Sequence, residues 1–190
     1  MIAAGYFAKR VAPRPEEMDA PRVCEICSVS NCISQGPEEW LESWRHNELG
    51  WFNSIADALS VLPRETREPY RLFAYRVTPH FHRGGARLDT ELPPDVRPQP
   101  IPPDFVVRGF DAVSRSIDYP NGFEHSPLSC NYLATELDVN EFCLFSSLDA
   151  AFAGADALLG GPARARRLLR RSSAGGAREN DRRPARCLSD

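Results

Sequence analysis

The segment that decides the fold occurs twice: residues 46–59 read HNELGWFNSIADAL, and residues 139–152 read VNEFCLFSSLDAAF. The two copies align without a gap and share Asn, Glu, Phe, Ser and Ala at equivalent places, while apolar residues largely replace apolar ones. A segment repeated in this way is typical of a fold built from two related units. The seam between such units is where a binding cleft is expected.

Two further pairs of blocks support a duplication. Residues 5–8 (GYFA) resemble residues 109–112 (GFDA), and residues 24–32 (CEICSVSNC) align with residues 123–131 (FEHSPLSCN). The three pairs keep the same order along the chain, at offsets of 104, 99 and 93 residues. We therefore predict two copies of one unit, the second with shorter loops. Chance similarity among many offsets is the alternative.

Each copy is predicted to run strand, loop, short extended piece, helix, strand. β-prone residues indicate strands at 6–11, 71–77 and 105–113. A Pro followed by two acids predicts a helix over residues 37–44, since a first helical turn favours both. The predicted fold is α/β (α+β), with two related strand–helix–strand units packed pseudo-symmetrically.

Two helix starts are predicted inside the repeated segment. Ser54 is followed three residues later by Asp57, and Ser146 by Asp149, in each case just before an Ala-rich apolar run. A Ser side chain before a helix accepts a hydrogen bond from the first-turn backbone, so both serines are predicted caps.

The chain divides by composition into four parts. Residues 1–78 form the first unit and residues 105–159 the second. Between them, residues 79–104 hold seven of the seventeen prolines and are predicted to be a semi-rigid linker. Residues 160–190 form a basic end rich in Arg, Gly, Ser and Ala, which predicts a disordered tail.

Charge is distributed unevenly. Residues 1–159 contain 14 basic and 23 acidic residues, a net charge of −9, whereas residues 160–190 contain nine basic and three acidic residues, a net charge of +6. An acidic body repels phosphate, which argues against nucleic-acid binding by residues 1–159. No run approaches the roughly 20 apolar residues that span a bilayer, and no signal peptide is visible. We therefore expect a cytoplasmic protein with no membrane contact, whose six cysteines are mostly reduced.

Three interpretations of the basic tail stay open. Its Arg cluster, Arg164 to Arg186, has the charge to contact nucleic acid, but no aromatic residue follows Phe152 to stack on a base. It can equally be a solvated end that folds back on the acidic body. It can also be a shifted reading frame, because GC-rich DNA encodes Arg, Ala, Gly and Pro in such a frame. The closing strand of the second unit would then have been replaced.

One cysteine cluster has part of a metal-site pattern. Cys24 and Cys27 are two residues apart, Cys32 follows, and His46 lies further on. Zinc takes about four such ligands, so these four are the candidate metal site and zinc the candidate cofactor. The alternative is packing, because the aligned positions of the second unit hold Phe and Ser in place of the first two cysteines.

A thiol nucleophile is the candidate for catalysis. Cys130 lies near His125, and either Glu124 or Asn131 is available to orient the imidazole. A thiol needs a base within hydrogen-bond reach and a third group that holds that base, so these residue types fit covalent catalysis. The alternative is that they are ordinary turn and packing residues.

The candidate binding residues are polar groups repeated near the predicted seam. They are Asn47 and Glu48, Asn140 and Glu141, and the aligned pair Glu25 and Glu124. In one interpretation they face each other across the seam and bind a partner. In the other, each Asn turns its own chain and each Glu is solvated.

One short motif resembles a known family. Phe52, Ser54 and Ala58, followed by a strand over residues 72–77, are similar to the segment after the central strand in ADP-ribosyltransferase-like folds. The resemblance covers about 30 residues and would imply transfer of ADP-ribose from NAD.

The sequence contains no complete catalytic constellation beside its acidic body, which favours a non-enzymatic binding module. We expect a small bacterial accessory or immunity-type protein that uses an acidic seam to bind a basic or protein partner. The alternatives are an enzyme, thiol-based or ADP-ribosyl-transferring, and nucleic-acid contact through the tail.

Overall fold

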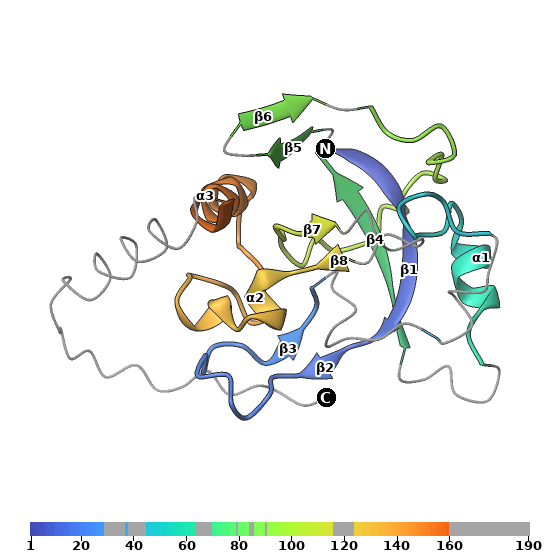
Figure 1. Cartoon of the computed structure of the whole chain (residues 1–190). Helices are drawn as coiled ribbons and strands as arrows, with labels where there is room; N and C mark the ends of the chain where they lie inside the picture. The colour runs from blue at the N-terminus through green and yellow to red at the C-terminus, as the bar shows by residue number, and fades with distance from the viewer. Residues whose placement is uncertain are drawn as a thin grey trace, which may run out of the picture.

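The computed structural model describes residues 1–28, 37, 45–63, 70–78, 80–83, 86–89, 91–115 and 124–159. Within these residues the protein is α+β, with four two-stranded antiparallel sheets and short helices (Figure 1). In chain order the elements are β1 (Ile2–Arg10), β2 (Ala12–Pro13), β3 (Glu25–Ile26), α1 (Ile55–Ser60), β4 (Tyr70–Val77), β5 (His80–Arg83), β6 (Ala86–Asp89), β7 (Ser114–Arg115), β8 (Glu124–His125), α2 (Pro127–Cys130), the 3₁₀ helix η2 (Leu133–Thr135) and α3 (Leu148–Leu159). No helix in this part of the chain is both long and apolar enough to cross a bilayer.

The longest sheet pairs β1 with β4. Tyr6 lies opposite Ala74 and Phe7 opposite Phe73, and a bulge interrupts the register between Ala3 and Gly5. In Figure 1 this ribbon curves through the molecule, with α1 on one side and β7, β8 and α2 on the other. The strand predicted at residues 71–77 is confirmed, and residues 6–10 of the strand predicted at 6–11 lie in β1.

The β1–β4 ribbon contributes to the first hydrophobic core. Its buried members are Ala4, Tyr6, Phe7, Trp51, Phe52, Ala58 and Val96. The Tyr6 hydroxyl lies 3.0 and 2.9 Å from the backbone oxygens of Gln99 and Pro100, so the Pro-rich segment covers this core. Part of the predicted linker is therefore packed structure, and another part forms the β5–β6 hairpin.

The second hydrophobic core combines residues far apart in sequence. Met18, Ala20, Val23 and Ile26, from the β2–β3 region, pack with Leu128, Ala134, Val139, Cys143, Phe145 and Ala151. Backbone hydrogen bonds fix this contact, since the amides of Cys24 and Glu25 both donate to the Glu141 carbonyl, at 2.8 and 3.1 Å. The β2–β3 hairpin of the first half is thus docked on the second half.

Two predicted elements differ from the structure. Residues 105–113 form no regular strand; within them only Phe110 makes a β-bridge, with Phe145. The helix over residues 148–159 begins after Ser147, whose hydroxyl accepts from the Ala150 amide at 3.1 Å, so Ser146 is the wrong cap. The cap at Ser54 is confirmed, because its hydroxyl accepts from the Asp57 amide at 3.0 Å.

Two other predictions fall outside the described residues. They are the helix over residues 37–44, of which only Pro37 is described, and the basic tail at 160–190.

Candidate functional site

A glycine and an asparagine connect β1 to the turn before α1. The Asn47 side chain donates to the Ala4 carbonyl at 3.0 Å and accepts from the amides of Leu49 and Trp51 at 3.0 and 3.3 Å. Gly5 lies directly against this turn, with φ +152°, and a Cβ there would be 2.7 Å from the Trp51 Cβ. Only glycine fits such a close approach.

The same contacts recur around Gly109 and Asn140. The Asn140 side chain donates to the Arg108 carbonyl at 2.8 Å and accepts from the amides of Phe142 and Leu144 at 3.0 and 3.1 Å. Gly109 has φ +151°, and a Cβ there would be 2.7 Å from the Leu144 Cβ. Each asparagine therefore holds a turn against an extended segment of its own half.

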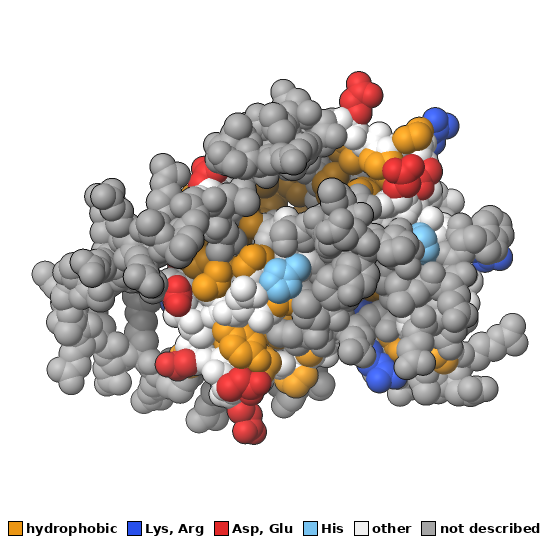
Figure 2. Space-filling model, in the orientation of Figure 1, with side chains coloured by type: hydrophobic (Ala, Val, Ile, Leu, Met, Phe, Trp, Pro, Cys, Tyr) orange, Lys and Arg blue, Asp and Glu red, His pale blue; other side chains and the backbone are white. Residues whose placement is uncertain are grey.

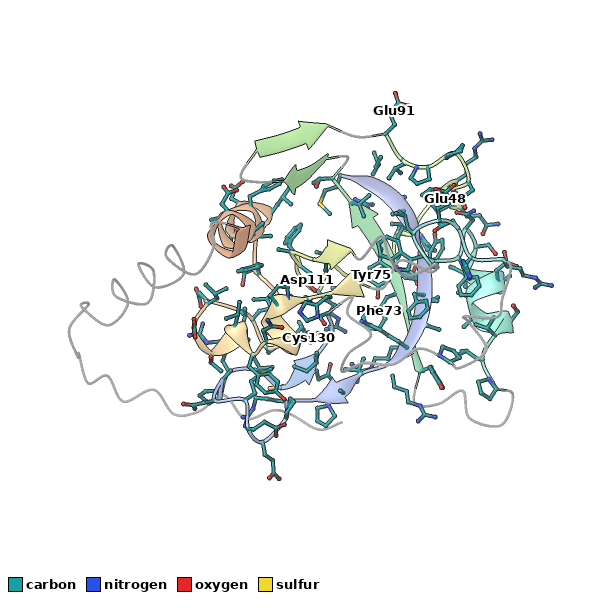
Figure 3. The ribbon with its side chains drawn as sticks, viewed as in Figure 1. Glu48, Phe73, Tyr75, Glu91, Asp111 and Cys130 are labelled. Carbon is teal, nitrogen blue, oxygen red and sulfur yellow. The ribbon has the colours of Figure 1, made fainter. Side chains whose placement is uncertain are left out.

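The predicted binding residues are not all in one place. Asn47 and Asn140 are used inside their own turns, as described above. Glu48 is exposed and its amide donates to the Asp95 carboxylate, which places it beside the Pro-rich segment. Figure 3 shows Glu48 on the opposite side of β1 from Cys130. Glu25 and Glu141 do meet at the seam between the halves, through the amide of Glu25 and the carbonyl of Glu141.

Buried polar side chains cross this seam. Lys9 of β1 has no exposed surface, and its ammonium donates to the Ser28 carbonyl. The Ser28 hydroxyl is 2.7 Å from the Ser129 hydroxyl, which belongs to α2. A buried charge is costly unless it is hydrogen-bonded, so these contacts specify how the two halves pack.

The second half adds an acidic group to this interior. The Ser126 hydroxyl donates to the Asp111 carboxylate at 2.8 Å. Figure 3 shows Asp111 and Cys130 on the side of the molecule that faces Phe73 and Tyr75 of β4. The Lys9 ammonium lies 5.2 Å from the centre of the Phe73 ring, within cation–π range. Lys9 is not among the residues predicted for the seam; the one signal for it in the sequence is that it is the sole lysine.

Two of the free thiols in this region are protected by burial. Burial and the nearby Glu25 carboxylate raise the pKa of Cys27 to about 11. Burial and the nearby Asp111 carboxylate raise the pKa of Cys143 to about 12. Both thiols are therefore protonated at neutral pH, which disfavours thiolate chemistry at these two positions.

Cys130 has a different environment, because it is half-buried at the end of α2. His125 Nε2 lies 2.8 Å from the Asn131 side-chain oxygen, so Asn131, one of the two candidates for this role, orients the imidazole. The Glu124 side chain, the other residue considered for this role, lies outside the described atoms. The Cys130 thiol is 4.0 Å from the Ser129 hydroxyl.

The candidate zinc ligands are placed as follows. Cys24 is disulfide-bonded, and a disulfide sulfur is not the thiolate that zinc binds. Cys27 is free and buried, His46 lies on the turn beside Phe52, and Cys32 is outside the described residues. Within the described part of the chain, no three His, Cys, Asp or Glu side chains are grouped as a metal ion requires.

A shallow pocket of about 320 Å³ lies where the two halves meet. Residues 19–22 line one side of it and residues 134–138 the other. The lining contains three carboxylates, those of Asp19, Glu136 and Asp138, but one guanidinium, that of Arg22. Arg22 pairs with Asp138. Figure 2 shows acidic side chains along the lower edge of the visible face, over the β2–β3 connection and the segment below α2.

A further carboxylate lies close to this pocket. The Tyr132 hydroxyl donates to the Glu17 carboxylate at 3.0 Å, which is another contact between the halves. A backbone hydrogen bond and this Tyr132 hydrogen bond hold the pKa of the Glu17 carboxyl below its usual value. We call Glu17, Asp19, Glu136 and Asp138 the acidic seam.

The chain matches no family model, no curated protein and no solved structure.

Proposed function

We propose that the protein is a binding module that uses the acidic seam to bind a basic segment of a partner protein. The observation that carries the proposal is the pocket between residues 19–22 and 134–138, with its excess of carboxylates over guanidinium groups. A site that spans two parts of the fold can be completed only when both are docked together. The expected role is that of a small accessory or immunity-type protein.

The proposal includes a duplicated architecture. The equivalent contacts of Gly5 with Asn47 and of Gly109 with Asn140 support two related units. The bridge of Tyr6 with Phe52 is matched by that of Phe110 with Phe145. In this view the seam is the junction of the two units, and the β2–β3 hairpin is the part of the first unit that closes it.

Electrostatics favours a partner with several positive charges. Asp138 is 92% exposed and Arg22 is 59% exposed at the side chain, so their ion pair is accessible to a competing cation. A single exposed ion pair is worth about 0–1 kcal/mol, so a tight complex needs several pairs together with apolar contact. Oppositely charged surfaces also raise the association rate, and added salt reduces that effect.

The test is binding of a fluorescein-labelled oligo-arginine peptide, followed by fluorescence anisotropy. We expect saturable binding that weakens with added salt, and no binding of an oligo-glutamate peptide. Asp19→Asn and Glu136→Gln together should weaken binding about tenfold, since each removes a charge from the pocket.

The matched control is Asp149→Asn together with Asp156→Asn, which removes two exposed carboxylates from α3. This variant should bind like the unsubstituted protein, apart from the small effect of net charge. Equal weakening in both variants would show a response to overall charge alone, which would refute a defined acidic seam.

A second candidate function is thiol catalysis at Cys130. The observation in its favour is the 2.8 Å contact that orients His125 through Asn131. Mass spectrometry after brief iodoacetamide treatment at neutral pH tests it. Alkylation of Cys130 that is no faster than that of a free model thiol, or that does not slow in His125→Ala, would exclude the enzyme.

A further inference from the structure

The extended segment before Phe110 has an unused backbone edge. Val106 and Val107 are 75% and 74% exposed, the largest values among the exposed large apolar side chains. Among the hydrogen bonds of the described residues, none involves the backbone of Val106, Val107 or Gly109. Exposed valines beside unpaired amides and carbonyls are characteristic of an open strand edge.

In the first half, the equivalent backbone edge pairs with a β-strand. Ala3 and Gly5 are the counterparts of Val107 and Gly109, and both are paired with β4, with Arg76 and Tyr75 respectively. Ala4 lies between Ala3 and Gly5, and Arg108 lies between Val107 and Gly109. Their backbone carbonyls point away from this edge, because the Ala4 carbonyl accepts from Asn47 and the Arg108 carbonyl accepts from Asn140. The edge at 106–109 therefore has the local backbone contacts of β1, and no strand among the described residues covers it as β4 covers β1.

We propose that the segment from Val106 to Asp111 is the docking site for an antiparallel β-strand of a partner protein. The strand would add to this edge by backbone hydrogen bonds, with alternate side chains covering the exposed valines. This site lies outside the acidic seam, so its test is independent of the function proposed above.

Charge and composition identify the kind of strand. Asp104 and Asp111 flank the edge, and the one cation within it, Arg108, lies over the Phe142 ring at 4.6 Å. Residues 1–159 carry a net charge of −9, so basic residues are favoured in the incoming strand. β4 has this character, since Arg71 and Arg76 flank a run of four apolar and aromatic residues. The residues after α3 are a poor source, because they are rich in Arg, Gly and Ser and contain no aromatic residue.

The test uses the full chain and a synthetic peptide with the sequence of β4, extended by a short lysine tag for solubility. The readouts are fluorescence anisotropy and amide hydrogen exchange by NMR. We expect saturable binding that slows exchange at the Gly109 amide. A control peptide N-methylated at the positions of Phe73 and Tyr75 should bind at least about tenfold more weakly, because it loses backbone donors but keeps the same charge.

A pair of protein variants completes the test. Val107→Pro removes one amide of the edge and should weaken peptide binding, whereas Val107→Thr keeps the amide and the branched shape and should not. Equal binding of the two peptides, or no binding, would overturn the proposal. Slow exchange of the Gly109 amide without peptide would show that the chain itself fills the edge, which would also overturn it.

Discussion

Removal of the Asn47 or Asn140 side chain tests the contacts that hold the turn of each half against its own extended segment. Asn47→Ala loses three hydrogen bonds to backbone groups, those of Ala4, Leu49 and Trp51, at 3.0 to 3.3 Å, and a fourth to the Asn53 side chain at 3.1 Å. At about 1 kcal/mol for each bond, the free energy of unfolding should fall by about 4 kcal/mol. Asn47 is 3% exposed, so water cannot fully replace the lost partners.

Asn140→Ala should cost less. It also loses three backbone partners, on Arg108, Phe142 and Leu144, but Asn140 is half-buried and Arg108 is exposed. We expect a loss of about 2 kcal/mol, because water can reach some of the groups left behind. The two substitutions share no partner, so their effects should add within about 0.5 kcal/mol in the double variant.

Urea unfolding followed by tryptophan fluorescence measures these changes, provided that the dependence of the free energy of unfolding on urea concentration is the same in all variants. Asn131→Ala is the control, since this exposed side chain contacts His125 and should cost less than about 1 kcal/mol. The interpretation would be refuted if Asn47→Ala and Asn140→Ala were as mild as the control. Asn47→Asp should not restore the free energy of unfolding of the unsubstituted protein, because it keeps the acceptor oxygen but places a second carboxylate oxygen against the Ala4 carbonyl.

Three further predictions follow from the seam and the second core. The raised pKa values of Cys27 and Cys143, about 11 and about 12, mean that these thiols ionise first in the unfolded chain. Their contribution to the free energy of unfolding should be constant below about pH 8.5 and should fall above it by about 1.4 kcal/mol per pH unit for each thiol. Cys27→Ala should remove part of this alkaline slope in urea titrations. Gly154→Ala places a Cβ 2.3 Å from Phe145 Cζ and should lower the melting temperature by an amount equivalent to about 1–3 kcal/mol, whereas Ala153→Ser beside it on the exposed face should not. Asp138→Asn should change stability by less than about 0.5 kcal/mol, as measured by urea unfolding, because its ion pair with Arg22 is exposed.

Local chemistry was predictable where it depends on near neighbours. The cap at Ser54 and the strand at 71–77 follow from residue type and spacing, and both are present. The local motif predicts the cap of α3 one residue too early, because Asp149 lies three residues after Ser146 and completes a capping pattern there. The gapless alignment had already placed Ser147 opposite Ser54, so repeat position was a better guide than the local motif.

Long-range contacts were not predictable in the same way. Docking of the β2–β3 hairpin on the second half depends on the Glu141 carbonyl, a backbone group with no signature in sequence. Burial of Lys9 also has no such signature, since lysine is rarely buried and this one requires the Ser28 carbonyl from another segment. The acidic seam is a product of the same docking, because its two sides are over a hundred residues apart.

The failure of residues 105–113 to form a regular strand has a physical reason that connects these points. A strand is stabilised by cross-strand pairing, and an isolated extended segment has no such gain to offset its conformational entropy. β1 obtains that pairing from β4, whereas the segment at 105–113 obtains only the bridge between Phe110 and Phe145. β-propensity alone therefore gave a wrong strand at 105–113, because the presence of a pairing partner decides whether a strand forms. On this argument, a strand that binds at Val107 and Gly109 should convert the segment into a second copy of the β1 arrangement.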